Sequence, residues 1–288
     1  MQQKQFETIE ITDKGNLGVT LLYKTLPGRM CLRLLIRPTL SRLFGFIMDR
    51  RISALPVKRF VRKNKIDLNE YKDTKYKSFN AFFTREIKDG MRPMSGNPFD
   101  LNSPCDGALT AYPISDDSVF RIKGTVYDVA GLLKDVELAK EFNGGTCLIF
   151  RLAPDNYHRY CYIDDGKVLN NKKIKGVLHT VRPLALKKYL IYKQNAREYE
   201  VIETKNFGKA IQMEVGALFV GRIVNNKHEG LFKRGEEKGM FEFGGSTVVM
   251  LFKHNVMSIN AEILENTRND HETIVKMGMK IGEKTIDI

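Results

Sequence analysis

The sequence predicts an α+β fold, in which a helical N-terminal segment over residues 1–98 precedes a β-rich catalytic domain over residues 99–288. Two observations lead to this prediction. Before about residue 65 the apolar residues recur at helical spacing, whereas from about residue 100 onward short apolar stretches of strand length alternate with turn residues. A chain of 288 residues with 42% hydrophobic residues is also long enough to bury a substantial core.

The first element is a basic amphipathic segment. Between Lys24 and Lys65 the chain has twelve Lys and Arg residues and one acidic residue, Asp49. Pro38 is predicted to begin a second helix there, because proline fits the first helical turn. An arginine row (Arg29, Arg33, Arg37) lies beside an apolar stripe formed by Leu32, Leu35, Ile36, Leu40, Leu43 and Ile47. Such a segment is typical of the membrane interface, and it is equally typical of a helix packed on the rest of the protein.

The later elements are predicted from apolar stretches and the turn residues between them. A helix is expected from about residue 76 to near Gly90, followed by a Pro/Gly/Asn loop. A helical insert is expected over residues 126–142. Strands are expected in the apolar stretches 145–154, 198–208, 210–224, 239–252 and 256–264.

Charge and cysteine content narrow the class of protein. The net charge of +13 favours an anionic partner, namely a nucleic acid, a membrane surface or a phosphorylated ligand. No stretch of 18 uncharged apolar residues is present, so no membrane-spanning helix is expected, and the N-terminus lacks the layout of a signal peptide. The cysteines form no CxxC pair, which predicts a reduced, cytosolic protein without a zinc or other metal site; they are Cys31, Cys105, Cys147 and Cys161.

Three residues of the β-rich part can supply a catalytic triad. A nucleophile needs a base within hydrogen-bond reach, and the base needs an orienting group. Asp106 in the turn SPCDGAL, His158 in LAPDNYHRYCY and Ser246 in GGST provide the orienting group, the base and the nucleophile. A serine hydrolase without self-cleavage is one function that follows. His179, in GVLHTVRP, is a second candidate base.

The two glycines before Ser246 indicate a different reaction. A hydrolase serine usually lies in GxSxG at a strand-to-helix turn, whereas here a strand is predicted to resume directly after the serine. Gly245 leaves its carbonyl unshielded, so the Ser246 hydroxyl can attack it in an N-to-O acyl shift. Elimination then releases the upstream chain, and hydrolysis leaves a pyruvoyl group on the downstream chain. Such a ketone can form a Schiff base with an amine and act as an electron sink. The stretch FNGGTC also has two glycines before a hydroxyl residue, so the triplet alone proves nothing.

Several separated motifs carry a resemblance to a known family. The stretches are FFTREIKDGMRP, SPCDGAL, LAPDNYHR, MEVGALFVG and KGMFEFGGSTVVMLF, in that order, and VKMGMKIG fits the tail. From about Phe79 to the C-terminus the chain resembles the phosphatidylserine decarboxylase family, in the form whose processing site reads Gly-Gly-Ser-Thr.

The resemblance implies a self-processing enzyme. It implies cleavage between Gly245 and Ser246, conversion of Ser246 to the pyruvoyl cofactor, and decarboxylation of phosphatidylserine to phosphatidylethanolamine. Asp106 matches the family's charge-relay aspartate, and His158 matches the histidine of its YHR motif. The implied partners are phosphatidylserine, an anionic membrane surface and the chain's own cleaved β and α chains as a heterodimer, and not nucleic acid. The implied location is peripheral, on the cytoplasmic face of the cell membrane.

One departure from the family pattern leaves the identity of the catalytic base undecided. Family members commonly carry a second histidine three residues after the first, and this chain has Cys161 there. A neutral thiol is a poor base, with a usual pKa near 8.5. Three alternatives follow: His158 activates Ser246, His179 enters the site instead, or processing is slow or lost. A relative that does not mature and binds only an anionic membrane surface is therefore the rival to the decarboxylase, together with the serine hydrolase.

Overall fold

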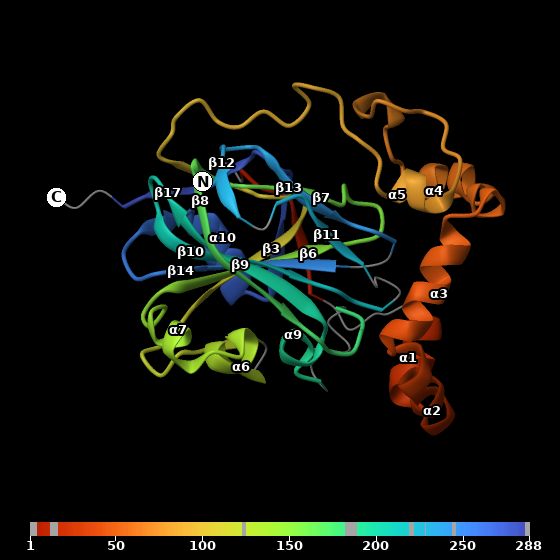
Figure 1. Ribbon diagram of the computed structural model, residues 1–288, viewed down its shortest axis with the longest axis horizontal. Helices are drawn as coiled ribbons and strands as arrows, with labels where there is room; N and C mark the ends of the chain where they lie inside the picture. Colours follow the sequence, from red (N-terminus) through yellow and green to blue (C-terminus); the bar gives the residue numbers. More distant parts are fainter. Residues whose placement is uncertain are drawn as a thin grey trace.

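The computed structural model describes residues 5–11, 17–122, 125–181, 189–218, 222–227, 229–243 and 246–285. Helices dominate the N-terminal part and strands the remainder, so the α+β prediction is confirmed (Figure 1). The N-terminal elements are β1 (Thr8–Glu10), α1 (Leu17–Lys24), α2 (Leu26–Leu35), α3 (Pro38–Met48), a 3-10 turn (Arg51–Ala54), α4 (Val57–Lys63), a second 3-10 turn (Leu68–Glu70) and α5 (Phe79–Phe83).

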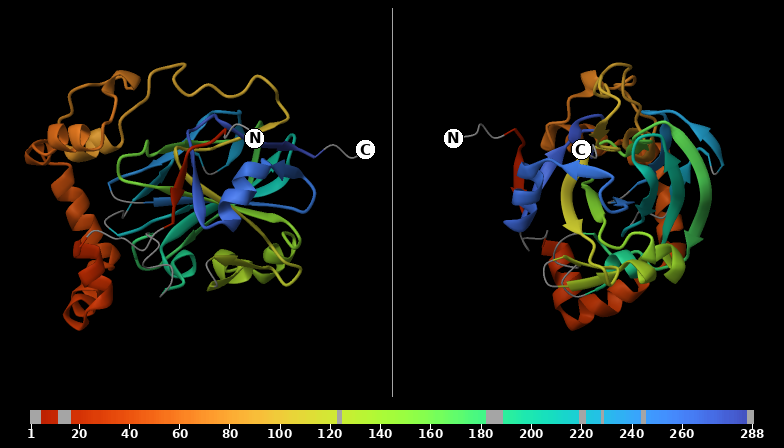
Figure 2. Two further views of the ribbon diagram at one scale, coloured as in Figure 1. Left: turned by 180° about the vertical axis from the view of Figure 1, so that it is seen from behind. Right: turned by 90° about the vertical axis from the view of Figure 1, so that its left-hand side faces the viewer.

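Helices α1 to α4, which we call the helical arm (residues 17–63), stand along one side of the β-rich part (Figures 1 and 2). The Thr25 side chain caps α2 by accepting from the Gly28 N–H at 3.0 Å. Pro38 occupies the first turn of α3, as predicted. Tyr23 and Leu32 are buried in the core of the β-rich part, so the arm is anchored through α1 and α2.

The largest sheet that the structure describes has nine antiparallel strands. In spatial order these are β1, β16 (His271–Val275), β3 (Gly107–Pro113), β6 (Thr146–Leu152), β14 (Ser246–Phe252), β10 (Gly208–Val215), β9 (Arg197–Thr204), β8 (Gly166–Ile174) and β12 (Gly230–Phe232). β14 lies at its centre, between β6 and β10. Smaller sheets are formed by β11 (Ile223–Asn225), β13 (Glu237–Phe241) and β7 (Arg159–Cys161), by β15 (Met257–Ile259), β17 (Lys280–Lys284) and β2 (Asp100–Asn102), and by β4 (Val119–Ile122) and β5 (Thr125–Asp128).

Each face of the large sheet packs against its own apolar core. Short helices cover one face, which we call the helix-covered face: α6 (Val129–Leu133), α7 (Val136–Lys140) and α9 (Ile191–Gln194). Strands β7, β13, β2 and β17 and helix α10 (Ala261–Arg268) cover the other, which we call the small-sheet face. Because side chains alternate along a strand, consecutive residues of β14 enter different cores.

Three local predictions were wrong. The helix expected to end near Gly90 stops at Phe83. Arg85 is buried, and its guanidinium donates to the carbonyls of Asp155 and Asn156 at 2.9 and 3.1 Å. The chain after it runs extended, with a bridge between Tyr71 and Ile87. Tertiary contacts therefore override local helix propensity there.

The other two errors concern helix boundaries. The predicted helix over 126–142 is instead β5 followed by α6 and α7, which are separated at Lys134 with φ of 51°. Two caps create the break, since Asp128 and Asp135 each accept a backbone N–H of the following turn. The strand predicted over 256–264 ends at Ile259, because Asn260 caps α10.

The attachment of the arm can be tested at Tyr23. Its hydroxyl accepts from the Thr180 N–H at 3.0 Å and lies 3.2 Å from Nδ1 of His179. We expect Tyr23→Phe to lower the free energy of unfolding by about 1–3 kcal/mol, because a buried N–H loses this acceptor. Urea denaturation measures the change. An unaltered midpoint would show that ring packing alone holds α1.

Candidate active site

Ser246 is the first residue of the central strand. It pairs with Leu152 of β6, while the next residue, Thr247, pairs with Val215 of β10. The predicted strand after the serine is therefore present, whereas Gly244 and Gly245 lie outside the described residues. Ser246 is fully buried, and its Oγ has no hydrogen-bond partner in the part of the chain that the structure describes. A buried hydroxyl without a partner is uncommon and marks Ser246 as a candidate functional group.

Strand alternation gives the direction of the Ser246 hydroxyl. Val248, Met250 and Phe252 belong to the core on the small-sheet face. Val249 and Leu251 belong to the core on the helix-covered face. Ser246 has the parity of the first group, so its side chain points to the small-sheet face.

His158 lies on that same side of the sheet. It follows the loop after β6 and directly precedes β7, and it is fully buried. Its Nδ1 lies 2.9 Å from the carbonyl oxygen of Asn156. Since that oxygen only accepts, Nδ1 carries the proton and Nε2 has a free lone pair. Nε2 has no partner among the described residues.

Aromatic packing connects His158 to the chain just before Ser246. The ring of His158 lies on Phe83, with centroids 3.8 Å apart, and Phe83 contacts Phe243 at 5.6 Å. Burial, assisted by the positive charge of Arg85, lowers the pKa of His158 to about 3. The imidazole is therefore neutral at neutral pH and able to accept a proton at Nε2.

Asp106 is near but differently engaged. It immediately precedes β3, and its carboxylate binds Arg92 through two hydrogen bonds of 3.1 and 3.0 Å and the Met277 N–H at 2.8 Å. Among the described residues no hydrogen bond joins it to His158, whose Nδ1 is taken by Asn156. Strands β3 and β14 flank β6, so Asp106 lies at the same end of the sheet as Ser246, about 10 Å away by strand spacing.

His179 lies on the opposite side of the sheet. Its ring stacks on Tyr189 at 4.3 Å and meets the Tyr23 hydroxyl, within the core of the helix-covered face. Asn195 fixes its backbone with hydrogen bonds of 3.0 and 2.8 Å. The geometry thus brings His158, and not His179, to the side to which the Ser246 hydroxyl points.

Cys161, where the resemblance led us to expect a second histidine, is not a base. Its Sγ is buried in β7, 3.4 Å from the carbonyl oxygen of Pro104. Burial raises the pKa of its thiol to about 12, so it stays protonated at neutral pH.

Sequence reasoning missed a buried charged network beside Ser246. The ammonium of Lys238 lies 2.7 Å from the carboxylate of Glu214 and 3.7 Å from that of Glu200, and all three side chains are buried. Glu214 pairs with Val248, so it points to the small-sheet face as a diagonal neighbour of Ser246, about 7–8 Å away. The only signal was charge at alternate positions of apolar strands, which is also the pattern of a solvent-exposed face.

Comparisons with known proteins show the family to which the chain belongs. The family model for phosphatidylserine decarboxylase matches residues 79–283. The chain belongs to the phosphatidylserine decarboxylase family. It is 48% identical over 269 residues to a phosphatidylserine decarboxylase proenzyme 2 of Clostridium acetobutylicum, covering 93% of this chain and 92% of the relative. It is 41% identical over 285 residues to a proenzyme of Ruminiclostridium cellulolyticum, covering 97% and 94%. The predictions of this family and of an enzyme are confirmed.

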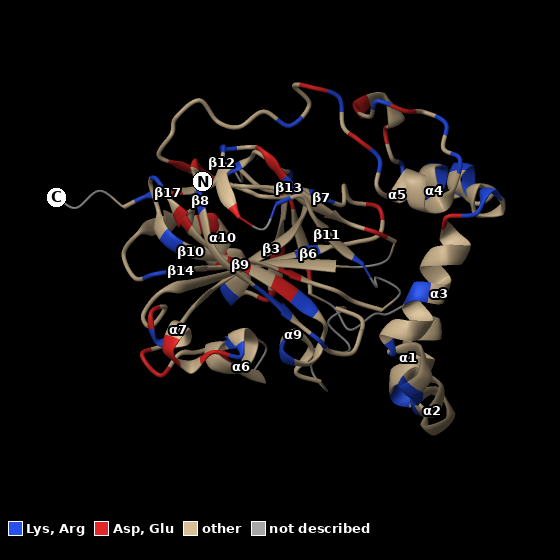
Figure 3. Cartoon of the chain, in the orientation of Figure 1, with Lys and Arg blue, Asp and Glu red and all other residues tan. Residues whose placement is uncertain are grey.

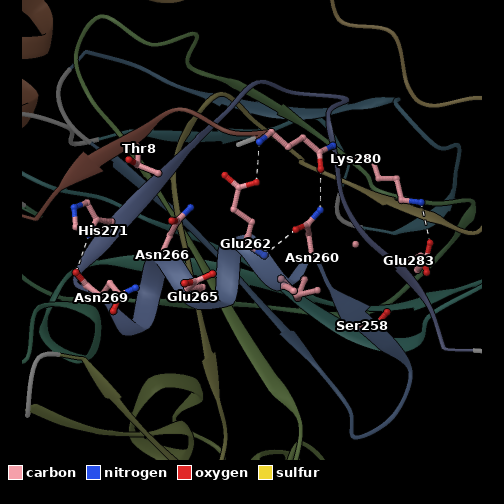
Figure 4. Close-up of a pocket in the computed structure, with 14 residues that line it drawn as sticks. Thr8, Ser258, Asn260, Glu262, Glu265, Asn266, Asn269, His271, Lys280 and Glu283 are labelled. Carbon is pink, nitrogen blue, oxygen red and sulfur yellow. Dashed lines mark hydrogen bonds and ion pairs between the residues drawn. The ribbon is translucent and has the colours of Figure 1, made fainter. Parts of the chain in front are cut away.

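One cavity in the described part of the chain lies apart from the candidate catalytic residues. It has a volume of about 970 Å³ and lies between β1, α10 and β17 (Figure 4). Glu262 and Asn260 reach across it to Gln5, and Glu262 accepts from the Gln5 N–H at 2.9 Å. It contains none of the candidate catalytic residues. Its side chains tether the N-terminal strand.

A neutral buried histidine makes stability depend on pH. The pKa of His158 is about 3 in the folded protein and about 6.5 when unfolded, so the unfolded chain binds more protons. The stability from His158 is complete above pH 6.5 and is lost as the pH falls toward 3. We compare the uncleaved Ser246→Ala chain with the same chain carrying His158→Gln as well. Below about pH 6, the chain that keeps His158 should lose about 1.4 kcal/mol more unfolding free energy per pH unit.

Urea titrations of both chains at several pH values measure this difference. Glu214 provides a contrast of opposite sign, because burial raises its pKa to about 7. Its contribution is present below about pH 4.5 and is lost as the pH rises through 7. Parallel curves for the parent and His158→Gln would contradict a neutral His158.

Proposed function

We propose that this chain decarboxylates the serine headgroup of phosphatidylserine, giving phosphatidylethanolamine, by means of a pyruvoyl group made from its own Ser246. The observation that carries the proposal is the buried, unpartnered hydroxyl of Ser246, which points to the side of the sheet that holds a neutral His158. Membership of the phosphatidylserine decarboxylase family supports the substrate and the reaction.

Maturation uses the chain's own groups. The Ser246 hydroxyl attacks the carbonyl carbon of Gly245 while Nε2 of His158 takes its proton, and that proton passes to the departing amide nitrogen. The product is an ester, from which elimination releases residues 1–245. A pyruvoyl carbonyl supplies an electron sink for a substrate that carries an amine. In this scheme Asn156 orients His158. Asp106 binds Arg92 and the Met277 N–H and so fixes the chain at the end of the sheet where Ser246 lies.

The cleaved chains are expected to remain together as a heterodimer. Residues 246–288 include β14, which lies between β6 and β10 of the upstream chain and is buried along its whole length. Separation would expose this apolar strand and break two ladders of hydrogen bonds. Strand pairing and burial therefore replace the lost covalent link.

The two parts of the chain have different roles in this proposal. Residues 1–98 form a membrane-associating region, and residues 99–288 form the catalytic domain. The helical arm leaves large apolar side chains more than two-fifths exposed: Leu21, Leu26, Met30, Leu34, Leu43, Phe46, Ile47, Ile52 and Leu55. Arginine and lysine positions lie along the same helices (Figure 3). Leu32, by contrast, packs into the core. The apolar stripe predicted from the sequence therefore contains both buried and exposed residues.

The arm therefore supports peripheral binding to the anionic cytoplasmic face of the cell membrane. No helix among the described residues is long and apolar enough to cross a bilayer. Exposed apolar residues rimmed by cations suit shallow insertion below the headgroups.

The first test of this function is fragment mass. We expect purified protein to contain residues 1–245 and 246–288, the smaller being roughly 5 of 33.0 kDa and one ammonia lighter than a Ser-initiated peptide. Ser246→Ala should leave one chain, because no hydroxyl remains to attack. Intact-mass spectrometry measures both. A folded, uncleaved parent would instead favour the non-maturing relative or a serine hydrolase.

The same spectra identify the base. We expect His158→Gln to slow cleavage at least a hundredfold, within the usual range for removing a general base, and His179→Gln to cleave normally. The reverse result would assign the base to His179.

Membrane binding is tested with liposomes that contain phosphatidylserine. We expect binding in low salt and release in high salt. Replacing Arg29, Arg33 and Arg37 by glutamine should weaken binding about a hundredfold, since each cation contributes about 1 kcal/mol near an anionic surface. Self-cleavage should be unaffected. Replacing Lys167, Lys205 and Lys233, which lie on the β-rich part, is the matched control; equal losses in both variants would show that only net charge matters.

A further inference from the structure

A second cavity lies where the helical arm meets the segment that leads to Ser246. It has a volume of about 460 Å³. One wall is α3, with Ser41, Arg42, Gly45 and Phe46, and the opposite wall includes Phe243, three residues before Ser246. The cavity therefore lies between the proposed membrane-binding surface and the segment that leads to Ser246.

The walls of this cavity carry charges of both signs. Arg42 and Arg222 contribute guanidinium groups, and Asp49 and Glu242 contribute carboxylates. Arg222 lies 3.4 Å from Glu242, whereas Arg42 forms no ion pair with any residue that the structure describes. A serine phospholipid headgroup likewise carries a phosphate, a carboxylate and an ammonium. The cavity is thus complementary to a headgroup with charges of both signs and keeps one cation available for phosphate.

An unsatisfied hydroxyl points to the same use. Ser41 is only 2% exposed, and its Oγ has no hydrogen-bond partner among the described residues. A buried polar atom of this kind usually has a partner. Ser41 lies on the cavity wall next to Arg42, and because its Oγ is covered in this structure, a phosphate oxygen would reach it only after a small shift of α3.

The cavity is also coupled to the cleavage segment. Asn80 lies on its wall, where its side chain donates to Asp49 at 2.8 Å and accepts from the Phe243 N–H at 3.1 Å. On the outer side, Leu43, Phe46 and Ile47 of α3 are exposed. Acyl chains held by the membrane would lie along these residues while the headgroup enters between α3 and Phe243.

We propose that this cavity is the headgroup pocket for the phospholipid substrate, in which Arg42 and Ser41 bind the phosphodiester and orient the serine moiety toward residue 246. This inference rests on the proposed function and adds to it the place and the residues of substrate binding.

Gly45 allows a direct test. A Cβ built there meets no atom within 4 Å, so alanine fits, and alanine favours a helix more than glycine does. A phenylalanine would instead fill the cavity. In the uncleaved Ser246→Ala chain we expect calorimetry to show unchanged binding of dihexanoyl phosphatidylserine, a soluble short-chain lipid, by Gly45→Ala, and at least tenfold weaker binding by Gly45→Phe. Gly96→Phe is the matched control, because Gly96 also has open space but lies outside the cavity.

Arg42→Gln tests the phosphate contact without a steric change. We expect its dissociation constant to rise about tenfold, consistent with loss of a charge-assisted hydrogen bond, while Arg268→Gln binds like the parent. In the cleavable chain, Arg42→Gln should mature fully and show a raised KM with nearly unchanged kcat. Inorganic phosphate should compete only weakly; competition as strong as that of the lipid would overturn a headgroup pocket in favour of a simple anion site.

The outcomes separate this inference from the function on which it rests. Normal lipid binding by both Gly45→Phe and Arg42→Gln, in a chain that cleaves and decarboxylates, would overturn the pocket and leave the function intact. If Gly45→Phe fails to fold, Arg42→Gln decides alone. An uncleaved, inactive parent would overturn both.

Discussion

The pairing of β14 with β6 on one side and β10 on the other is the constraint on which the site depends. It places Ser246 at the end of the central strand, fully buried and with its hydroxyl on the small-sheet face. A shift of the register by one residue would turn that hydroxyl to the helix-covered face and present Thr247 instead. The apolar residues that follow, which enter alternate cores, make such a shift costly. The position of the Ser246 hydroxyl is thus stabilised by the packing of the whole strand.

The same alternation distinguishes the two histidines. His158 and His179 are both buried, and burial lowers the pKa of both, so protonation state does not separate them. Position does. His179 is held by Tyr23 and Asn195 in the core on the helix-covered face, where it anchors the arm. His158 lies on the small-sheet face. Its Nδ1 is held by the Asn156 carbonyl, and its Nε2 has no partner among the described residues. A carbonyl can hold an imidazole tautomer in place of a carboxylate, which explains how Asp106 can be engaged by Arg92 instead.

The sequence predicted what depends on local pattern, and missed what depends on distant contacts. Alternating apolar stretches correctly indicated the strands around Ser246, and Pro38 correctly indicated the start of α3. The helix through Gly90 was wrong because Arg85 binds carbonyls seventy residues away. The Glu214–Lys238 network was missed because charged residues on a strand face look alike whether water or a second sheet covers them. The predicted relation of Asp106 to His158 came from the residue types that a catalytic triad needs and from the family resemblance, neither of which carries information about the ion pair with Arg92.

The arm, which we propose binds the membrane, contacts the segment before the proposed cleavage site. In the uncleaved chain Phe243 packs on Phe79 and Phe83 of α5, and its N–H is held by Asn80. The side chain of Asn80 binds Asp49 at the end of α3. The residues before the proposed scissile bond are therefore positioned by α5 and, through Asn80 and Asp49, by the arm, while those after it are positioned by the sheet. The described residues on both sides of the proposed scissile bond are thus held by packed elements, an arrangement that favours an intramolecular attack. In the proposed maturation β14 stays paired with β6 and β10 after cleavage, whereas the segment before Ser246 loses its covalent link to the strand.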